Sequence, residues 1–422
     1  ENSTNEEVLE RARAEIRRSC GGELPPVYDP FSGGGSIPLE AQRLGLPAYG
    51  SDLNPVAVMI GKAMIEIPPK FKDMEPIHPG LKDRNHYRNA EGLAEDVKYY
   101  GEWIREKAFE RIGHLYPKVD LPKEQGGGQA TVIAWIWART VPSPDPAFAD
   151  VSVPLASSFM LSTKTGREVW IQPEVNKSTK QISFRIRKGG TKAEIATAKK
   201  GTKVGQANFR CIISDAPING TYADSVAARG AMGETLLAVV AEGKSGRVYL
   251  DPSFVAKEKS TIDSNIALEF INLDHLNVPC RGTFASNAQG RHYKFRTFRD
   301  YFLERQLCAL GTLSELLKDV EVQIKQDAKD SSLSGDQQDL SNGGLGSKAY
   351  ADAIVVYLGF AINRLVDRCS SLCGWDSSRD TIRNVFARQA IAMTWDFAEG
   401  NPFSSSTGNF SSCLVWIAKV LD

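Results

Sequence analysis

Hydrophobic and polar positions switch between helical and extended spacing along the first seventy residues. The stretch 6–18 predicts a helix that leads into a short apolar strand, PPVYDPF. SIPLEAQRLG predicts a second helix, with Ser36 as its N-cap and Gly45 at its end. PAYGSD then predicts a second strand, and PVAVMIGKAMIEI a further helix. Strand, glycine-rich turn, helix, strand and helix begin an open parallel sheet, in which ligands bind at the carboxyl ends of strands.

The pattern changes twice in the rest of the chain. A charged helix is predicted over 91–116, and from about 129 to 255 short β-branched runs separated by Gly, Pro, Ser and Lys predict a β-rich insert. Helical spacing returns over 299–326, 349–370, 379–398 and 409–421. The pattern therefore predicts an α/β protein in four segments: an α/β unit at 1–70, a helical connection at 71–125, the insert at 126–260 and a helical region at 261–422.

Composition narrows the class of protein. With 422 residues, 42% of them hydrophobic, the chain can build two or three cores. Its 51 basic and 51 acidic side chains balance, so contact with nucleic acid depends on local patches. Seven scattered cysteines favour reduced thiols in the cytoplasm. No apolar run approaches the roughly 18 residues of a membrane span, and the polar opening is not a signal peptide, so we expect a cytoplasmic protein without a membrane partner.

The turn FSGGGSIP restricts the ligand. A phosphate-binding P-loop needs a lysine and a hydroxyl after its last glycine, where this turn has Ser36, Ile37 and Pro38. A dinucleotide fingerprint places a third glycine at the position of Pro38, although Asp52 is at a suitable distance to bind a ribose. A nucleoside triphosphate is therefore disfavoured, and NAD is a second choice.

S-adenosylmethionine fits the same positions better. Asp29 can bind its ammonium, the glycines allow close backbone approach, and the helix start at Ser36 favours its carboxylate. Asp52 can accept hydrogen bonds from the ribose hydroxyls, beside an adenine flanked by the next two residues. A tight structural turn is the alternative. The predicted cofactor-binding residues are Asp29, Pro30, Phe31, Gly33, Gly34, Gly35, Ser36, Asp52, Leu53 and Asn54.

The stretch DPFSGGGSIPLEAQRLGLPAYGSDLNPVAV resembles the cofactor motif of amino-methylating DNA methyltransferases. Later stretches, including GGGQATVIAWIWARTV, GETLLAVVAEG and YADAIVVYLGFAINRLVDRCSSLCGWD, are similar to the bacterial and archaeal adenine-specific DNA methylases that contain a zinc ribbon. The resemblance covers nearly the whole chain. It implies a class I (Rossmann-like) methyltransferase sheet with a β-rich insert, methyl transfer from S-adenosylmethionine to N6 of adenine in DNA, and a setting in phage defence beside helicase-like subunits.

The chain departs from that family at its catalytic motif. No D-P-P-Y occurs, and the resemblance implies that this motif lies beyond WIAKVLD. Near-matches are VYLDPSF, which follows an apolar strand, and GNPFS, which follows a predicted helix; PDPAF lies in a Pro-rich loop. Ordinary turns and helix ends have the same composition. The catalytic candidates are accordingly Asp251, Pro252, Phe254, Asn401, Pro402 and Phe403.

The zinc ribbon implied by the resemblance has lost its ligands. Where relatives place two cysteine pairs, this chain has VPSPDPAFAD and FRCIISDAP, with Cys211 alone. A structural zinc site requires four thiolate or imidazole ligands, so no zinc or other metal site is expected.

Two local clusters of basic and aromatic residues suit nucleic-acid contact. The first covers 162–203 and the second 281–302. The alternative interpretation of the first cluster is a solvated β-hairpin with ordinary surface lysines. The candidate nucleic-acid contacts are Arg185, Arg187, Lys188, Arg291, Lys294 and Arg296.

The sequence therefore predicts a member of an S-adenosylmethionine-dependent adenine methyltransferase family that is incomplete or weakly active as this chain. The alternative is a non-catalytic nucleic-acid-binding or assembly subunit of a phage-defence complex. An NAD-binding enzyme is the third reading.

Overall fold

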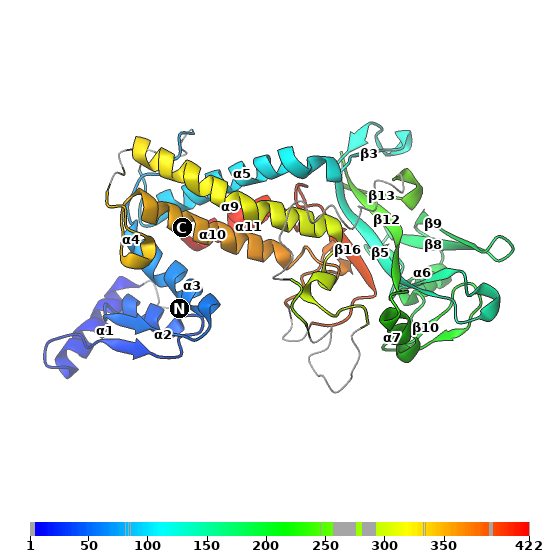
Figure 1. The fold of residues 1–422 in the computed structure, drawn as a ribbon, viewed down its shortest axis with the longest axis horizontal. Helices are drawn as coiled ribbons and strands as arrows, with labels where there is room; N and C mark the ends of the chain where they lie inside the picture. Colours follow the sequence, from blue (N-terminus) through cyan, green and yellow to red (C-terminus); the bar gives the residue numbers. More distant parts are fainter. Residues whose placement is uncertain are drawn as a thin grey trace. The chain divides into compact units, whose positions relative to one another are not determined.

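The computed structural model describes residues 5–80, 82, 84, 86–244, 246–255, 276–280, 293–331, 333, 335–387 and 391–421. The chain is a mixed α/β protein (Figure 1). Its contacts divide it into two compact units. Unit 1 contains Glu1–Ile104, Leu317–Ala361 and Leu414–Asp422, and unit 2 contains Arg105–Leu316 and Ile362–Cys413. The division into four consecutive segments stays a prediction.

Unit 1 begins with the predicted order of elements. Helix α1 (Glu6–Ser19) leads to β1 (Val27–Asp29), α2 (Ser36–Arg43), β2 (Ala48–Gly50) and α3 (Pro55–Gly61). The two strands pair in parallel, with Asp29 opposite Gly50. A π-helix (Lys62–Glu66) and α4 (Ile67–Lys70) continue from α3. The short sheet and the helices beside it therefore confirm the local prediction.

The start of α2 differs from the prediction. Ser36 is its first helical residue and Gly35 is the N-cap, in the left-handed region at φ 78°. A glycine adopts this conformation without the steric cost that a serine would meet. The chain therefore turns into the helix at Gly35, and the predicted N-cap was wrong by one residue.

Four long helices supply the rest of unit 1: parts of α5 (Glu91–Ile112), α9 (Glu304–Asp330), α10 (Ser347–Val366) and α11 (Phe410–Leu421) (Figure 1). Two buried tyrosines on these helices each donate a hydrogen bond to a carboxylate on a neighbouring helix. The Tyr350 hydroxyl donates to Asp96 over 2.6 Å, and the Tyr100 hydroxyl donates to Asp327 over 2.8 Å. Hydroxyl groups placed in this way satisfy acids inside a helical core.

One helix in the described part of the chain, α10, is long and apolar enough to cross a membrane by length and composition. Slightly more than half of its apolar window is buried inside the protein. Core helices of water-soluble proteins have the same composition.

Unit 2 is built on an antiparallel sheet. Its strand order is β13 (Gly246–Leu250), β12 (Gly233–Gly243), β5 (Val132–Pro142) and β16 (Asp396–Gly400), and β6 (Ser152–Leu155) also pairs with β5 (Figure 1). All but the last residue of β5 are buried. A strand paired on both sides and covered on both faces reads as the continuous apolar run seen in this sequence.

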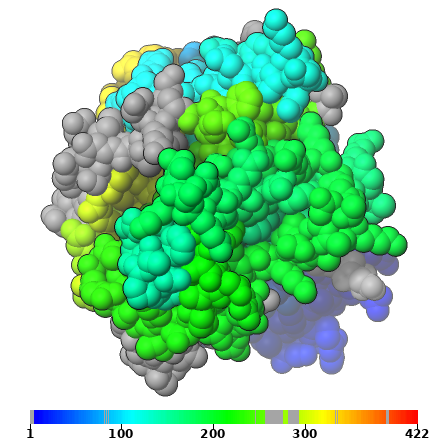
Figure 2. Space-filling view, turned by 90° about the vertical axis from the view of Figure 1, so that its right-hand side faces the viewer, coloured from blue at the N-terminus to red at the C-terminus, as the bar shows by residue number. Residues whose placement is uncertain are grey.

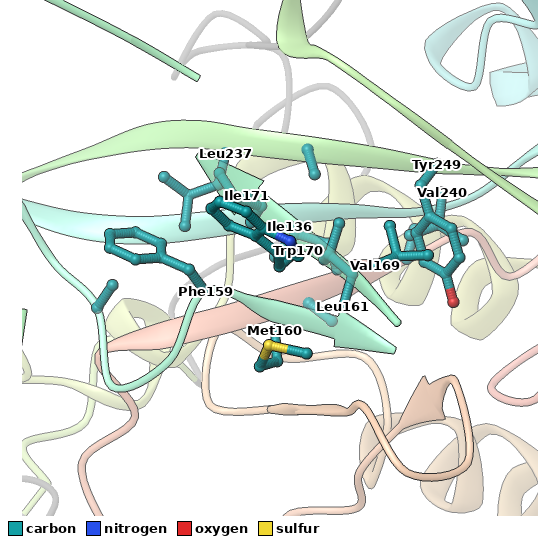
Figure 3. Packing of buried hydrophobic residues seen from close by; sticks show 14 of the residues in the cluster. Ile136, Phe159, Met160, Leu161, Val169, Trp170, Ile171, Leu237, Val240 and Tyr249 are labelled. Carbon is teal, nitrogen blue, oxygen red and sulfur yellow. The ribbon is translucent and has the colours of Figure 1, made fainter. Parts of the chain in front are cut away.

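A second sheet packs against the first. It consists of β7 (Met160–Ser162), β8 (Val169–Asn176) and β9 (Gln181–Lys188). Trp170 and Ile171 of β8 lie against Ile136 of β5 and Leu237 of β12 in one apolar cluster (Figure 3). The β-rich insert forms most of the face that Figure 2 turns toward the viewer. The predicted insert is thus a layered β structure, and its core also contains Cys373, Ile382 and Ala398 from later in the chain.

Within unit 2, a buried ion pair joins helix α9 to strand β16. The Arg305 guanidinium donates to Glu399 through Nε over 2.8 Å and through Nη2 over 2.9 Å. Trp137 donates to the same carboxylate over 2.9 Å, and the guanidinium lies 3.8 Å from the centre of the Trp135 ring. Both charged side chains are almost fully buried. Each charge therefore depends on the other inside an apolar environment.

Shorter elements complete the described chain. The helices are α6 (Lys192–Lys200) and α7 (Gly220–Ala228), both inside the β-rich insert. Single-turn 3-10 helices occupy Gly113–Leu115, Lys123–Gln125, Pro146–Phe148, Pro252–Phe254, Phe298–Tyr301 and Leu340–Asn342. The remaining strands are β3 (Val119–Asp120), β4 (Gln129–Ala130), β10 (Phe209–Arg210), β11 (Pro217–Ile218), β14 (Trp375–Asp376) and β15 (Thr381–Ile382).

The predicted helix over 379–398 was wrong. The described part of this stretch contains β15 and the start of β16. Asp396 pairs with Ala138 of β5, and Gly400 with Ala134. Pairing with a central strand distant in the sequence outweighs the helix preference of the alanines and arginines.

The fold class is confirmed at the level of a mixed α/β protein. Among the described residues, β1 and β2 are the two strands paired in parallel, whereas the larger sheets are antiparallel. The class I methyltransferase sheet that the resemblance implies therefore stays a proposal.

Candidate functional site

The glycine turn between β1 and α2 is held by Asp52. One oxygen of its carboxylate accepts from the Gly33 N–H over 2.8 Å and the other accepts from the Asn54 N–H over 2.8 Å. These backbone donors, Asn54 first, hold the pKa of Asp52 below its usual value. A carboxylate has about four acceptor positions, so Asp52 keeps acceptor capacity after binding the turn.

Asp29 lies at the end of the neighbouring strand. Its carboxylate accepts from the Phe31 N–H over 3.1 Å, and its carbonyl accepts from Ser51 over 3.0 Å. Ser32 in turn donates to the carbonyl of Ser51 over 3.0 Å. The carboxyl ends of both strands and the glycine turn are thereby joined, so the structure places the two predicted acids at one sheet end.

The three glycines of the turn have different roles. Gly35 is required by the fold, because it has a positive φ and a β-carbon there would lie 3.1 Å from Ile65. Gly33 also has a positive φ, of 48°. Gly34 has neither constraint: its φ is ordinary and a β-carbon would meet no atom within 4 Å. The open space at Gly34 is what close approach of a ligand to the backbone requires.

Apolar side chains stand beside the turn in solvent. Phe31 is 83% exposed and Leu53 is 98% exposed. Each lies within two residues of one of the two acids, so both are accessible to a ligand at the turn. Asn54, which was predicted to flank an adenine, caps α3 by accepting from Val56 over 3.0 Å.

Sequence reasoning missed a pocket next to the turn. Its volume is about 430 Å³, and it lies between α2, β2 and the π-helix. Ser32 and Gly35 line it together with Lys62 and Glu66, which form a 2.8 Å ion pair. Neither Asp29 nor Asp52 lines it. A π-helical turn is often found at functional sites, but it has no signature in a single sequence.

The catalytic candidate Asp251 has a structural role. It follows β13 and belongs to unit 2, whereas the glycine turn belongs to unit 1. Its carboxylate accepts from the Ile186 N–H over 2.5 Å and from Arg185 over 3.1 Å. Of its neighbours, Pro252 begins a 3-10 helix and Phe254 is partly exposed. The carboxylate therefore fixes β13 to β9.

The second candidate, Asn401, follows strand β16 and not a helix as predicted. Its amide donates to the Val132 carbonyl over 2.8 Å and accepts from the Phe403 N–H over 2.9 Å. Phe403 is buried and packs edge-on against Phe109. Pro402 is buried as well. The position after a strand matches the methyltransferase motif, yet these side chains hold the protein's own backbone.

The candidate nucleic-acid contacts that the structure describes differ in whether their side chains already bind other protein groups. Arg185 pairs with Asp251, and Arg187 donates to Gln172 over 2.5 Å. Lys294 pairs with Glu234, and Arg296 donates to the Ala228 carbonyl over 3.0 Å. Lys188 is exposed and has no ion pair in the described part of the chain. Arg291 lies outside the described residues.

Metal ligands do not cluster in the described ranges, where no group of three His, Cys, Asp or Glu side chains could hold an ion. Cys211 is buried and accompanied by the Ser143 hydroxyl at 3.2 Å. No protein-family model matches the chain, and no match is found among the curated proteins or the solved structures.

Proposed function

We propose that the glycine turn between β1 and α2 binds S-adenosylmethionine and that the chain takes part in methylation of the N6 amino group of adenine in DNA. The observation that carries the proposal is the Asp52 carboxylate. It ties the glycine turn to the end of β2 and keeps acceptor positions for a ribose.

The other residues of the turn suit the rest of the cofactor. Asp29 provides a negative charge for the ammonium group, and Gly34 leaves the backbone open to close approach. The N-terminus of α2 at Ser36 favours a carboxylate through its free N–H groups and dipole. Leu53 and Phe31 offer apolar contact for the adenine ring. This combination binds a nucleoside with an amino-acid tail better than it binds a phosphate.

The cofactor supplies a methyl group bonded to a positively charged sulfur. The protein's part in such a reaction is orientation of the amine and acceptance of the charge that develops on its nitrogen. Asp251 and Asn401 already bind the protein's own groups. We therefore infer that this chain alone binds the cofactor and turns over slowly or not at all.

The first prediction concerns cofactor affinity. Calorimetric titration with S-adenosylmethionine, S-adenosylhomocysteine and NAD should give micromolar binding of the two adenosyl ligands. Asp52→Ala should weaken this binding at least about tenfold, since it removes a charge-assisted acceptor and releases the turn. Glu23→Ala is the matched control, because it removes an exposed acid of the same unit outside the turn.

Two results would overturn the proposal. One is the absence of adenosyl-ligand binding, and the other is equal binding by Asp52→Ala and the unaltered chain. Tight binding of NAD in their place would favour the third reading, a nicotinamide-dependent enzyme.

A second function has an observation in its favour. The side chains of both catalytic candidates support the fold, which suits a non-catalytic nucleic-acid-binding or assembly subunit of a cytoplasmic phage-defence complex with helicase-like partners. Salt-dependent binding of DNA without adenosyl-ligand affinity would distinguish this function from the first.

A further inference from the structure

Unit 2 contains a large hollow of its own. Its volume is about 1070 Å³, and it is lined by the turn between β7 and β8, the β12–β13 hairpin and the turns around 380 and 405–407. Small-molecule sites usually enclose about 300–1,000 Å³. A ligand of nucleotide size therefore fits.

Three residues that line this hollow contain buried polar atoms without hydrogen-bond partners. The Tyr249 hydroxyl, Arg247 Nε and one carboxylate oxygen of Asp380 have no hydrogen bond to any described residue. Tyr249 and Asp380 are each only 6% exposed. Leaving such a group unpaired is unfavourable, so a solvent or ligand atom is expected to complete each one.

The hydroxyl of Tyr249 is poised as a donor. Its ring lies at the edge of the apolar cluster, and its hydroxyl points away from the other labelled side chains (Figure 3). Burial and the nearby Asp380 carboxylate raise the pKa of Tyr249, which keeps the proton on the oxygen. Ser162 and Asp380 lie near this oxygen without forming a hydrogen bond of regular geometry.

Arg247 is held in one orientation. Its Nη2 donates to the Ser406 hydroxyl over 3.0 Å, and its Nη1 donates to the Arg379 carbonyl over 3.4 Å. With the fork of the guanidinium fixed in this way, the direction of the remaining Nε–H is also fixed. The residues that line the hollow thus offer two donors, of which the one on Arg247 is oriented, and one acceptor.

The rim of the hollow is positively charged. Five basic and three acidic side chains line the site. Two of the acids are engaged, because Asp380 pairs with Lys164 at 2.6 Å and Glu242 accepts from Ser405 at 2.8 Å. Arg167, Lys188 and Lys244 are exposed and form no ion pair within the described ranges. Such a rim attracts an anion.

We propose that this hollow is a nucleotide-binding site, in which Arg167, Lys188 and Lys244 bind the phosphate and Tyr249, Arg247 and Asp380 bind the edge of the base. Ile133, Val169 and Val248 add apolar wall for a flat ring. Donors and an acceptor side by side match a base edge, whereas a bare anion would use the rim alone. The site lies within unit 2 and does not depend on the glycine turn.

Calorimetry on the full chain tests the proposal. The ligands are the four common nucleoside 5′-monophosphates, the matching nucleosides, inorganic phosphate and a single-stranded DNA oligonucleotide. We expect at least one monophosphate to bind saturably and more tightly than its nucleoside or inorganic phosphate. Similar affinity of the monophosphate and the oligonucleotide indicates a free nucleotide as ligand, and an oligonucleotide that binds at least tenfold tighter indicates a nucleotide within a strand.

Two variants locate the site. Tyr249→Phe removes an oxygen that makes no hydrogen bond in the described structure, so it should fold normally and lower affinity about threefold to tenfold. The double variant Arg167→Ala/Lys188→Ala should lower it by at least about tenfold. Lys199→Ala/Lys200→Ala on α6 is the matched control, since both lysines are exposed and lie outside the lining.

Three results would overturn the assignment. They are the absence of saturable monophosphate binding, equal affinity for inorganic phosphate and nucleotide, and unchanged affinity in both variants of the hollow. Asp52→Ala should leave nucleotide affinity unchanged, which separates this site from the proposed methyl-donor site.

Discussion

At the scale of single residues, Asp96 is a carboxylate kept in the core of unit 1 by three donors. The N–H groups of Ile77 and His78 donate to it over 2.9 and 3.0 Å, and the Tyr350 hydroxyl donates over 2.6 Å. Burial nevertheless prevails over these donors and raises the pKa of Asp96 to about 6. The ionised form is therefore less stable in the folded protein than in water.

This pKa predicts a pH dependence. Because the folded-state pKa lies above the unfolded value, the contribution of Asp96 to stability is fully present below about pH 4 and is lost as pH rises through 6. The free energy of unfolding of the unaltered chain should fall relative to that of Asp96→Asn by up to about 3 kcal/mol between pH 4 and 7. Urea unfolding at a series of pH values measures the difference.

Glu23→Gln, which changes an exposed acid of unit 1, is the control and should keep the pH dependence of the unaltered chain. Parallel curves for Asp96→Asn and the unaltered chain would contradict the predicted shift.

Arg305 and Glu399 permit a second residue-scale prediction. Glu399→Gln leaves a buried guanidinium without its counter-charge and should destabilise unit 2 by about 3–5 kcal/mol. Arg305→Met should have a similar cost, and the double variant should cost clearly less than the two changes added together. Denaturant unfolding of all four proteins measures this coupling.

Arg18→Ala is the exposed control: it breaks a pair with Glu15 in α1 and should leave the free energy of unfolding nearly unchanged. Additive effects of the two buried changes would show that Arg305 and Glu399 are energetically independent, contrary to the geometry.

At the scale of elements, the two kinds of sheet differ in how well they are supported. β1 and β2 are three residues each, pair with one another alone among the described strands, and expose Tyr28 and Tyr49. β5 is paired on both sides and almost entirely buried. A two-stranded sheet is marginal in water, so the glycine turn rests on a locally weak element.

Hydrogen exchange should reveal this difference. Amides of β1 and β2 are expected to exchange much faster than those of β5 and β12, because local opening exposes few buried contacts. Exchange followed by mass spectrometry measures it, and S-adenosylmethionine should slow exchange over residues 27–35. Equal protection of β1 and β5 would contradict the expected difference in local stability.

Elements whose signals are local were predictable from the sequence. The β1–α2–β2 order follows from apolar runs punctuated by glycine and proline, and it is confirmed. The prediction of a helix over 379–398 was wrong because the strand pairing of this stretch depends on Trp137 and its neighbours in β5, which are far away in the sequence. Composition favours a helix there, and sheet registration has no local signature.

At the scale of the whole molecule, each unit has its own core and its own candidate site. The glycine turn was predictable because its acids and glycines lie within thirty residues of one another. The hollow of unit 2 was not, because Tyr249 and Asp380 meet only after the sheets have formed. Lys188 was predicted as a nucleic-acid contact, and it lies at the rim of this hollow.

The buried pair of Arg305 and Glu399 also has a consequence for how this sequence can change over time. A replacement at either position alone passes through a protein with an unmatched charge in its core. Accepted changes at the two positions should therefore occur together, although 94 residues separate them along the chain. The residues at these two positions of helix α9 and strand β16 should therefore vary as a pair.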